Sequence, residues 1–400
     1  MLPNKKDFLK ESEFFKSQLL DNILPFWIKH SRDEQCGGYH TCLNRDGSVF
    51  DYDKVCTWGQ GRIMWTFGYL YNEFEQRPEW LQMAVHGIEF MQKYGFDDDG
   101  RLYYSLTREG KPLAETRDVF AELSLVAGLA ECFKATGDRE LLGLAKKCLF
   151  TVTKVVDDPR TNPHRHYLSQ FRPVSLNAEY MILLNTSQLL RKVDDDPRYD
   201  QISRECVDKI LNLHFSPANK CVFEAVAPDG SALPGRMGRW ICPGHMIELG
   251  WFLIHEAQYR NDQSLIEKGI NIMEWGMDWG WDKTYGGLIN DVDIEGKFGL
   301  GSECVNASFK MWWSVLEALY AMALAYLSTG KQKFLDDYTM IKKWSFKHFA
   351  DDEYGEWYGY LSIEGHILDG RAKGTDKKNC FHIGRAFYLC HRIFEKLAAG

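Results

Sequence analysis

The stretch ATGDRELLGLA, residues 135–145, closes one apolar-periodic run and opens the next within a few residues. Polar breaks of this kind contain Gly, Pro or Asp, are followed at once by a fresh apolar-periodic run, and recur about every 60 to 70 residues. They fall at Pro78, Asp138, Pro197, Asp262 and Gly330. A single period over the chain indicates one repeated structural unit.

Between these breaks lies a second series, of acidic or glycine-rich loops that run into aromatic residues. Its members are CGGYHTCL near Gly38, DDDGRLYYSL near Gly100, ANKCVFEAV near Cys221, TYGGLIN near Gly287 and EYGEWYGYL near Gly355, with a poorer copy over residues 162–167. The two interleaved series indicate six copies of a helix–short turn–helix–longer loop unit, and six such units can close into a ring. We therefore predict an all-α fold: an (α/α)6 barrel of six helical hairpins, with long loops and the functional site at one mouth.

The composition favours one domain over residues 1–400. A chain of 400 residues would usually suggest two or three domains, but no Pro/Ser-rich linker or low-complexity tract divides it, and a closed ring shares one core. Aromatic residues make up 14% of the chain, and many lie in the loop series. Rings around a concave mouth suit the apolar face of a sugar, although the same rings could plug the ends of a wide barrel. The sequence leaves both interpretations open.

Charge and hydropathy exclude several classes of protein. The formal net charge is −8, with an estimated isoelectric point near 5.9 and no large Lys/Arg cluster, so we expect neither nucleic-acid nor membrane partners. The N-terminus lacks the apolar region of a signal peptide, and no run approaches the length of a membrane span. Eleven irregularly spaced Cys without a CxxC pair fit reduced thiols and a cytoplasmic location.

Two helical runs each begin with a histidine that has an ionisable neighbour. In GHMIELGWFLIHEAQYR, residues 244–260, His245 and Glu248 share a face because side chains three or four residues apart meet on a helix. In NCFHIGRAFYLCHRIF, residues 379–394, His382 is followed at i+3 by Arg385. We expect each histidine at the start of an inner helix, near the mouth. A lone histidine in such a place is more often a core residue or a cap, but the ionisable neighbours favour function.

The other histidines give no metal signal, since no HxxxH or HExxH set occurs. We therefore expect no metal in the chemistry. Polar neighbours predict a surface position for His164, His166, His255, His348, His366 and His391.

At these residues the chain resembles the N-acylglucosamine 2-epimerase family. The matching stretches run over most of the length: FWIKHSRDEQCGGYHTCLNRDG, TWGQGRIMW, LPGRMGRWICPGHMIELGWFL, WGWDKTYGGL, KMWWSVLEALYA, DDEYGEWYGYLSIEGHI and KKNCFHIGRAF. A GHxxExGWF element paired with CFHxxR is a specific combination. The family fold is the same (α/α)6 barrel that the repeat predicts.

The resemblance implies inversion at C2 of a reducing sugar, without a required cofactor. One base removes the C2 proton, which the neighbouring C1 carbonyl acidifies, and an acid returns a proton to the other face of the enediolate. Histidine suits both roles because its ordinary pKa lies near neutrality. The family's catalytic residues map onto His245, His382 and Glu317, with Glu248 expected to orient and polarise His245. Substrate binding is expected from Arg62, which matches the family's essential arginine, and from Trp58, Trp313 and Arg385.

Two departures from the family pattern bear on the substrate. The wider superfamily's sugar isomerases and cellobiose epimerases carry an additional His where LNAEYMILLN has Met181. This favours the N-acylglucosamine or simple mannose 2-epimerase branch over aldose–ketose isomerases. The usual WWPHSEA reads WWSVLEA here, so we expect Ser314 and Val315 to alter the pocket wall. We predict interconversion of N-acetylglucosamine and N-acetylmannosamine, with D-mannose/D-glucose 2-epimerisation or a related aldose–ketose isomerisation as the alternative.

Other activities and partners stay open at this point. An (α/α)6 barrel can also be a glycoside hydrolase, which would need two carboxylates across the scissile bond, or a non-catalytic binding protein. ATP activates several family members without being consumed; Lys378 matches the family, Asn379 does not, and there is no Walker-type motif. The resemblance also suggests a homodimer. The one partner that the chemistry requires is a small-molecule sugar.

Overall fold

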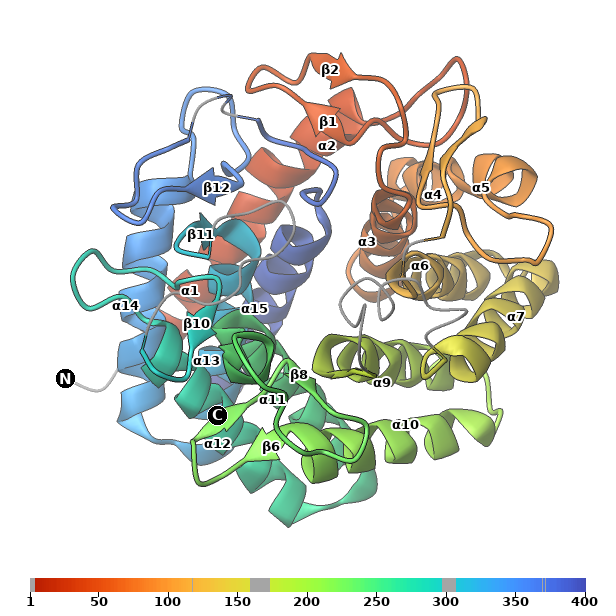
Figure 1. Ribbon diagram of the computed structural model, residues 1–400. Coiled ribbons are helices and arrows are strands. Elements are labelled where there is room, and N and C mark those ends of the chain that lie inside the picture. The colour runs from red at the N-terminus through yellow and green to blue at the C-terminus, as the bar shows by residue number, and fades with distance from the viewer. Residues whose placement is uncertain (1–3, 117, 159–172, 297–306, 369, 371) are drawn as a thin grey trace.

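Two concentric layers of helices surround one axis (Figure 1). The computed structural model describes residues 4–116, 118–158, 173–296, 307–368, 370 and 372–400. Within these residues the inner layer consists of α3 (Trp58–Glu73), α6 (Phe120–Thr136), α9 (Asn177–Arg191), α11 (Pro243–Arg260), α13 (Trp312–Thr329) and α15 (Phe381–Ala399). The outer layer consists of α1 (Lys5–Ser17), α2 (Leu24–His30), α4 (Pro78–Val85), α5 (Ile88–Tyr94), α7 (Arg139–Val155), α10 (Arg198–Lys209), α12 (Gln263–Gly280) and α14 (Gln332–Phe349).

The inner helices form a closed ring. Each contacts the next in chain order, and α15 returns to α3. The outer helices pack on inner ones, for example α7 on α6, α12 on α11 and α14 on α13. The predicted (α/α)6 barrel is therefore confirmed, and the relatives described below share it.

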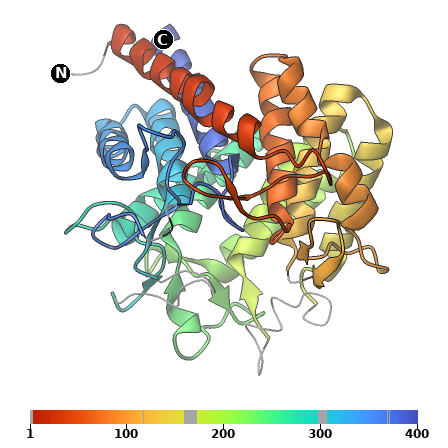
Figure 2. The same cartoon turned by 90° about the horizontal axis from the view of Figure 1, so that it is seen from above.

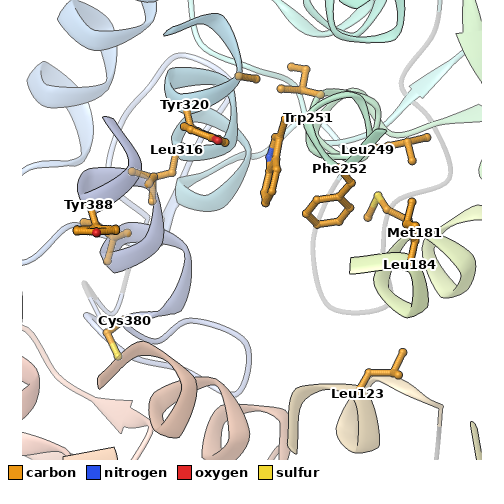
Figure 3. Packing of buried hydrophobic residues seen from close by; sticks show 14 of the residues in the cluster. Leu123, Met181, Leu184, Leu249, Trp251, Phe252, Leu316, Tyr320, Cys380 and Tyr388 are labelled. Carbon is orange, nitrogen blue, oxygen red and sulfur yellow. The ribbon is translucent and has the colours of Figure 1, made fainter. Parts of the chain in front are cut away.

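Apolar periodicity decides which layer a helix joins. The outer helix α10 buries Tyr199, Ile202, Ser203, Cys206 and Val207, spaced as one face of a helix. The inner helix α13 instead buries every residue from Ser314 to Ala325, because it has neighbours on all sides. Figure 3 shows how large side chains fill the contacts between inner helices: Met181 and Leu184 of α9 point toward Phe252 of α11.

The predicted polar breaks are the short turns from an inner helix to the next outer helix. Pro78 is the first residue of α4, and Pro197 is the N-cap of α10. Asp138 and Asp262 cap α7 and α12 by accepting hydrogen bonds from the backbone N–H groups of Glu140 and Leu265. Gly330 ends α13 with φ of 67°, a left-handed conformation that glycine adopts without strain.

The predicted aromatic loops contain short strands that the all-α prediction did not include. The strands are β1 (Cys42–Leu43), β2 (Val49–Asp51), β3 (Ser105–Leu106), β4 (Pro112–Ala114), β5 (Ser175–Leu176), β6 (Phe215–Ser216), β7 (Cys221–Val222), β8 (Ala225–Val226), β9 (Trp240–Ile241), β10 (Val292–Asp293), β11 (Lys310–Met311) and β12 (Tyr360–Leu361). Figure 2 shows these loops gathered on one side of the ring and both termini on the other. The poorer loop copy at residues 162–167 lies outside the described residues.

Antiparallel strand pairs join neighbouring loops around the mouth. β5 pairs with β8, β9 with β10 and β11 with β12, and each pair links loops that lead to adjacent inner helices. Single bridges between Leu43 and Gly374 and between Lys54 and Leu106 tie the first loop to the last and to the second. Because β5, β9 and β11 directly precede α9, α11 and α13, these pairs fix where the inner helices begin.

Two further sequence expectations concern membranes and thiols. No helix in the described part of the chain combines the length and apolarity needed to cross a bilayer. Ten of the eleven cysteines lie in the described residues and all ten are free thiols, which agrees with the expectation that they are reduced.

Candidate active site

His245 and His382 both lie in the first turn of an inner helix at the loop mouth, as predicted. The antiparallel pair of β9 with β10, in which Ile241 faces Val292, leads directly into α11. Pro243 then begins α11, where its missing N–H costs no helical hydrogen bond. His382 is the second residue of α15. The two imidazoles come from the starts of separate helices, and both face the mouth end of the barrel.

The indole of Trp313 packs close to both histidines. Its ring centroid is 5.2 Å from that of His245 and 5.8 Å from that of His382. Gly244 makes this arrangement possible, because a Cβ at that position would lie 2.5 Å from the indole. Trp313 is partly exposed, so it offers a ring face to a molecule held between the histidines.

His245 is paired with Glu224, a residue that the sequence did not single out. Its Nδ1 lies 3.1 Å from Oε1 of Glu224. Burial alone would lower the pKa of His245, but the Cys242 sulfur and the Glu224 carboxylate raise that pKa well above its ordinary value. Burial raises the pKa of the Cys242 thiol to about 11. The raised pKa of His245 favours its protonated form.

His382 has the opposite character. Burial and then the nearby Arg62 cation hold its pKa well below the ordinary value. Its Nδ1 lies 2.7 Å from Oε1 of Glu317. Because a carboxylate accepts, we assign the proton of the neutral imidazole to Nδ1, which leaves Nε2 free to take a proton. The pKa values of the two candidate histidines are thus shifted in opposite directions.

Glu248 does not orient His245, so that expectation is wrong. Its carboxylate accepts a hydrogen bond from Arg385 Nη2 at 2.5 Å, and the same nitrogen donates to Glu317 at 2.7 Å. Trp251 Nε1 donates to the other oxygen of Glu317 at 3.0 Å. Arg385 is 5% exposed, so its guanidinium compensates two buried carboxylates. Through these bonds Arg385 holds Glu317 against His382, and its expected role in substrate binding stays a prediction.

Arg62 is the cation that remains unpaired at the site. Its guanidinium carbon lies 4.9 Å from the ring centroid of Phe381 and 5.5 Å from that of Trp58. Among the described residues its guanidinium has no hydrogen-bond or ion-pair partner, and only its backbone carbonyl accepts a side-chain hydrogen bond, from Thr66. Trp58 Nε1 is likewise buried without an acceptor in that part of the chain. A cation and a donor without partners beside the two histidines suit an oxygen-rich ligand.

Two groups have the spacing of metal ligands: Glu224, Cys242 and His245, and Glu248, Glu317 and His382. In the second group, both carboxylates already accept hydrogen bonds from Arg385. In the first, the thiol stays protonated at neutral pH and offers a poor ligand. The donor chemistry of these groups thus gives no support for a metal.

Comparison with known proteins places this chain in a family. Residues 37–386 match the family described as N-acylglucosamine 2-epimerase (GlcNAc 2-epimerase). The chain belongs to this family.

Named relatives cover nearly the whole chain. The N-acylglucosamine 2-epimerase of Mus musculus is 33% identical over 390 residues, which is 95% of this chain and 91% of the mouse protein. The human enzyme of that name is 31% identical over 409 residues, covering 99% and 94% of the two chains. The solved cellobiose 2-epimerase of Spirochaeta thermophila superposes with a TM-score of 0.82 at 22% identity, over 98% of each chain. That last likeness bears on the fold alone.

The chain departs from the usual family sequence at Ser314 and Val315. The expectation that these two side chains alter the pocket wall is wrong. Ser314 and Val315 are both fully buried. Ser314 Oγ donates to the Met311 carbonyl, and its Cβ lies 2.9 Å from where a Cβ on Gly244 would be. The two side chains support the start of α13 against α11 and leave the pocket surface to Trp313. Met181 is also fully buried, in the contact between α9 and α11.

Several histidines do not follow the expected surface position. His391 is 2% exposed and lies 2.8 Å from Ser12 Oγ. His255 is partly buried on the inside of the ring, with Nε2 2.7 Å from the Tyr320 hydroxyl. The prediction from polar sequence neighbours is wrong for these two histidines because their helices bury faces that include polar side chains. His164 and His166 lie outside the described residues.

Proposed function

We propose that the chain interconverts N-acetylglucosamine and N-acetylmannosamine by moving a proton at C2. Membership of the N-acylglucosamine 2-epimerase family supports an isomerase of this kind, and the relatives at 31–33% identity carry that name in several mammals. The observation that carries the mechanism is the pair of histidines that both lie close to Trp313 and have opposite pKa shifts.

The two histidines suit a two-base epimerisation. Neutral His382 takes the C2 proton of the open-chain sugar on Nε2, and the C1 carbonyl accepts the electron pair to give an enediolate-type intermediate. Protonated His245 then donates its Nε2 proton to C2 on the opposite face, which inverts the configuration. In the reverse direction neutral His245 takes the C2 proton and protonated His382 returns one, so that direction uses the other protonation state of the pair. Proton exchange with solvent interconverts the two states between turnovers, and the opposite pKa shifts favour the state that the forward direction needs.

The remaining groups stabilise charge and hold the sugar. The unpaired Arg62 guanidinium suits the oxygen at C1, where negative charge develops during proton removal. Glu317 keeps His382 in the Nδ1-protonated form and stabilises the imidazolium after proton transfer. Trp58 and Trp313 offer ring faces to the apolar face of the sugar.

The test of this function is a comparison of four sugars with the purified protein in D2O, following C2 configuration and deuterium by NMR. We expect 2-acetamido sugars to exceed free hexoses in kcat/KM by roughly 10- to 200-fold, since a missing group in a shaped pocket is worth about 1–3 kcal/mol. If kcat/KM for mannose or glucose equals or exceeds that for the 2-acetamido sugars, the substrate assignment changes to the free hexoses. Release of reducing ends from a glycoside would indicate a hydrolase, and binding without C2 inversion a binding protein.

Regulation, assembly and location remain predictions. Activation by ATP would have to use groups other than Lys378, which is fully buried, with Nζ 3.0 Å from Glu356 Oε1. A homodimer and a cytoplasmic location follow from the family resemblance and the composition. Sedimentation with and without ATP tests the oligomeric state and any effect of ATP on it.

A further inference from the structure

A second cavity lies at the end of the barrel opposite the active site. Its volume is about 160 Å³. Its lining comes from the middle and later parts of α3, α9 and α11, and from Arg385 and Leu389 of α15, whereas the candidate histidines sit where α11 and α15 begin. A cavity of this size suits a ligand smaller than the drug-sized molecules that occupy roughly 300–1,000 Å³.

The charges that line the cavity are all positive. Arg191, Lys192 and Arg385 line it, and no Asp or Glu does among the described residues, although the whole chain has a net charge of −8. Arg191 pairs with Glu256 and Asp200 behind the wall. Lys192, exposed at the rim, forms no ion pair with the described residues. The cavity thus presents one cation without a direct ion pair, and the carboxylates of Glu131 and Glu73 act on its charge from farther away.

Two buried donors in the lining lack acceptors. Trp65 is 3% exposed and Arg385 is 5% exposed, yet Trp65 Nε1 and Arg385 Nε have no hydrogen-bond partner in the described part of the chain. A buried donor left unpaired costs about 1–3 kcal/mol. The Trp65 indole also stacks on Tyr69, with centroids 4.6 Å apart and planes 12° apart, which gives the cavity a rigid aromatic wall. An acceptor-rich, negatively charged guest would satisfy these groups.

We propose that this cavity binds a small organic or inorganic anion, a carboxylate or a phosphate, and that its occupancy changes catalysis through Arg385. The Arg385 side chain lines the cavity on one side and donates to Glu248 and Glu317 on the other. Glu317 in turn holds His382. An anion that accepts a hydrogen bond from the Arg385 guanidinium weakens the bond between Arg385 and Glu317. Because Glu317 contacts His382, this changes the basicity of His382. Linkage requires that the sugar and the anion affect each other's binding equally.

The binding test uses calorimetry with lactate and with inorganic phosphate, on the wild type, Lys192→Met and Lys154→Met. Lys154 is an exposed lysine of the outer helix α7 and serves as the matched control. We expect saturable binding of at least one anion, weakened tenfold or more in Lys192→Met and unchanged in Lys154→Met. Trp65→Phe keeps a ring but removes the donor, and should weaken binding severalfold. No saturable binding, or equal binding by Lys192→Met and wild type, would overturn the site.

The coupling test measures epimerase kinetics at saturating anion. We expect kcat or KM to change at least twofold in the wild type, and to stay constant in Lys192→Met at the same anion concentration. Glycerol at equal concentration controls for viscosity and neutral polar solutes. Saturable binding without any kinetic change would overturn the route through Arg385. Because the calorimetry needs no turnover, failure of the cavity and failure of the proposed epimerase activity are separately visible.

Discussion

The Nδ1 of His245 lies 3.1 Å from the carboxylate of Glu224, a loop residue 21 positions earlier in the chain. The backbone of Glu224 is fixed on both sides: its N–H donates to the Trp240 carbonyl, and its carbonyl accepts from the Asn177 N–H. These bonds come from the segments that lead into α11 and α9. Glu224 is therefore a rigid positioning residue that keeps His245 oriented and protonated.

Glu224→Gln should shift the pH dependence of epimerisation. The Glu224 carboxylate raises the pKa of His245, so protonated His245 persists above the ordinary value near 6.5 and is lost as pH rises through the raised pKa. Removing the carboxylate lowers that pKa, and the alkaline fall in kcat should move to lower pH. Each unit of lowering costs about tenfold in activity above the pKa. The measurement is a kcat–pH profile from pH 5.5 to 10.

Glu205→Gln is the matched control for this prediction. Glu205 belongs to α10, where it accepts an exposed hydrogen bond from Gln201. Its profile should overlay that of the wild type. An alkaline limb that stays in place in Glu224→Gln would show that Glu224 has no influence on the acid.

Arg62→Lys should lower kcat more than it raises KM, by roughly 10²-fold or more, because the planar guanidinium fork is lost where charge develops. The structure gives Arg62 no ion pair among the described residues, so the melting temperature should stay within a few degrees of the wild type. Arg77→Lys, on an exposed turn beside Glu75, should change neither quantity. A large loss of stability with normal kinetics of the folded fraction would make Arg62 a structural residue.

Gly244→Ala should damage the site through Trp313. The added methyl would lie 2.5 Å from the indole, and this ring lies close to both histidines. We expect kcat to fall at least tenfold and stability to drop by about 1–3 kcal/mol from overpacking. Gly143→Ala on α7, where nothing lies within 4 Å of the new methyl, should instead be neutral or stabilise by about 0.5–1 kcal/mol. Full activity in Gly244→Ala would show that the position of Trp313 is not critical.

The sequence predicted the repeat well because turn chemistry is local. Asp138, Asp262 and Gly330 act within a few residues of themselves, so their spacing alone marks where helices start and end. The periodicity also placed His245 and His382 at the mouth. The short strands escaped prediction because two-residue pairs between separate loops leave no periodic signal.

The pairing of charges could not be predicted in the same way. Helical spacing puts Glu248 on the same face of α11 as His245, but the Glu248 carboxylate accepts a hydrogen bond from Arg385 of α15 instead. Glu224 lies in a loop whose path depends on β5, β8 and β9, so nothing in its sequence neighbourhood links it to His245. Local spacing therefore identified the histidines, and only the packing of α9, α11 and α15 identified their partners.

The most direct test of the two-histidine account is C2 deuterium exchange by His245→Ala and His382→Ala in D2O, each with N-acetylglucosamine and N-acetylmannosamine separately. The C2 protons of the two epimers point to opposite faces, and each remaining histidine reaches one face. The account predicts that neither folded variant epimerises, and that any remaining exchange occurs with only one epimer, the opposite one in the two variants. Substantial epimerisation by either variant, or exchange of the same epimer by both, would contradict it.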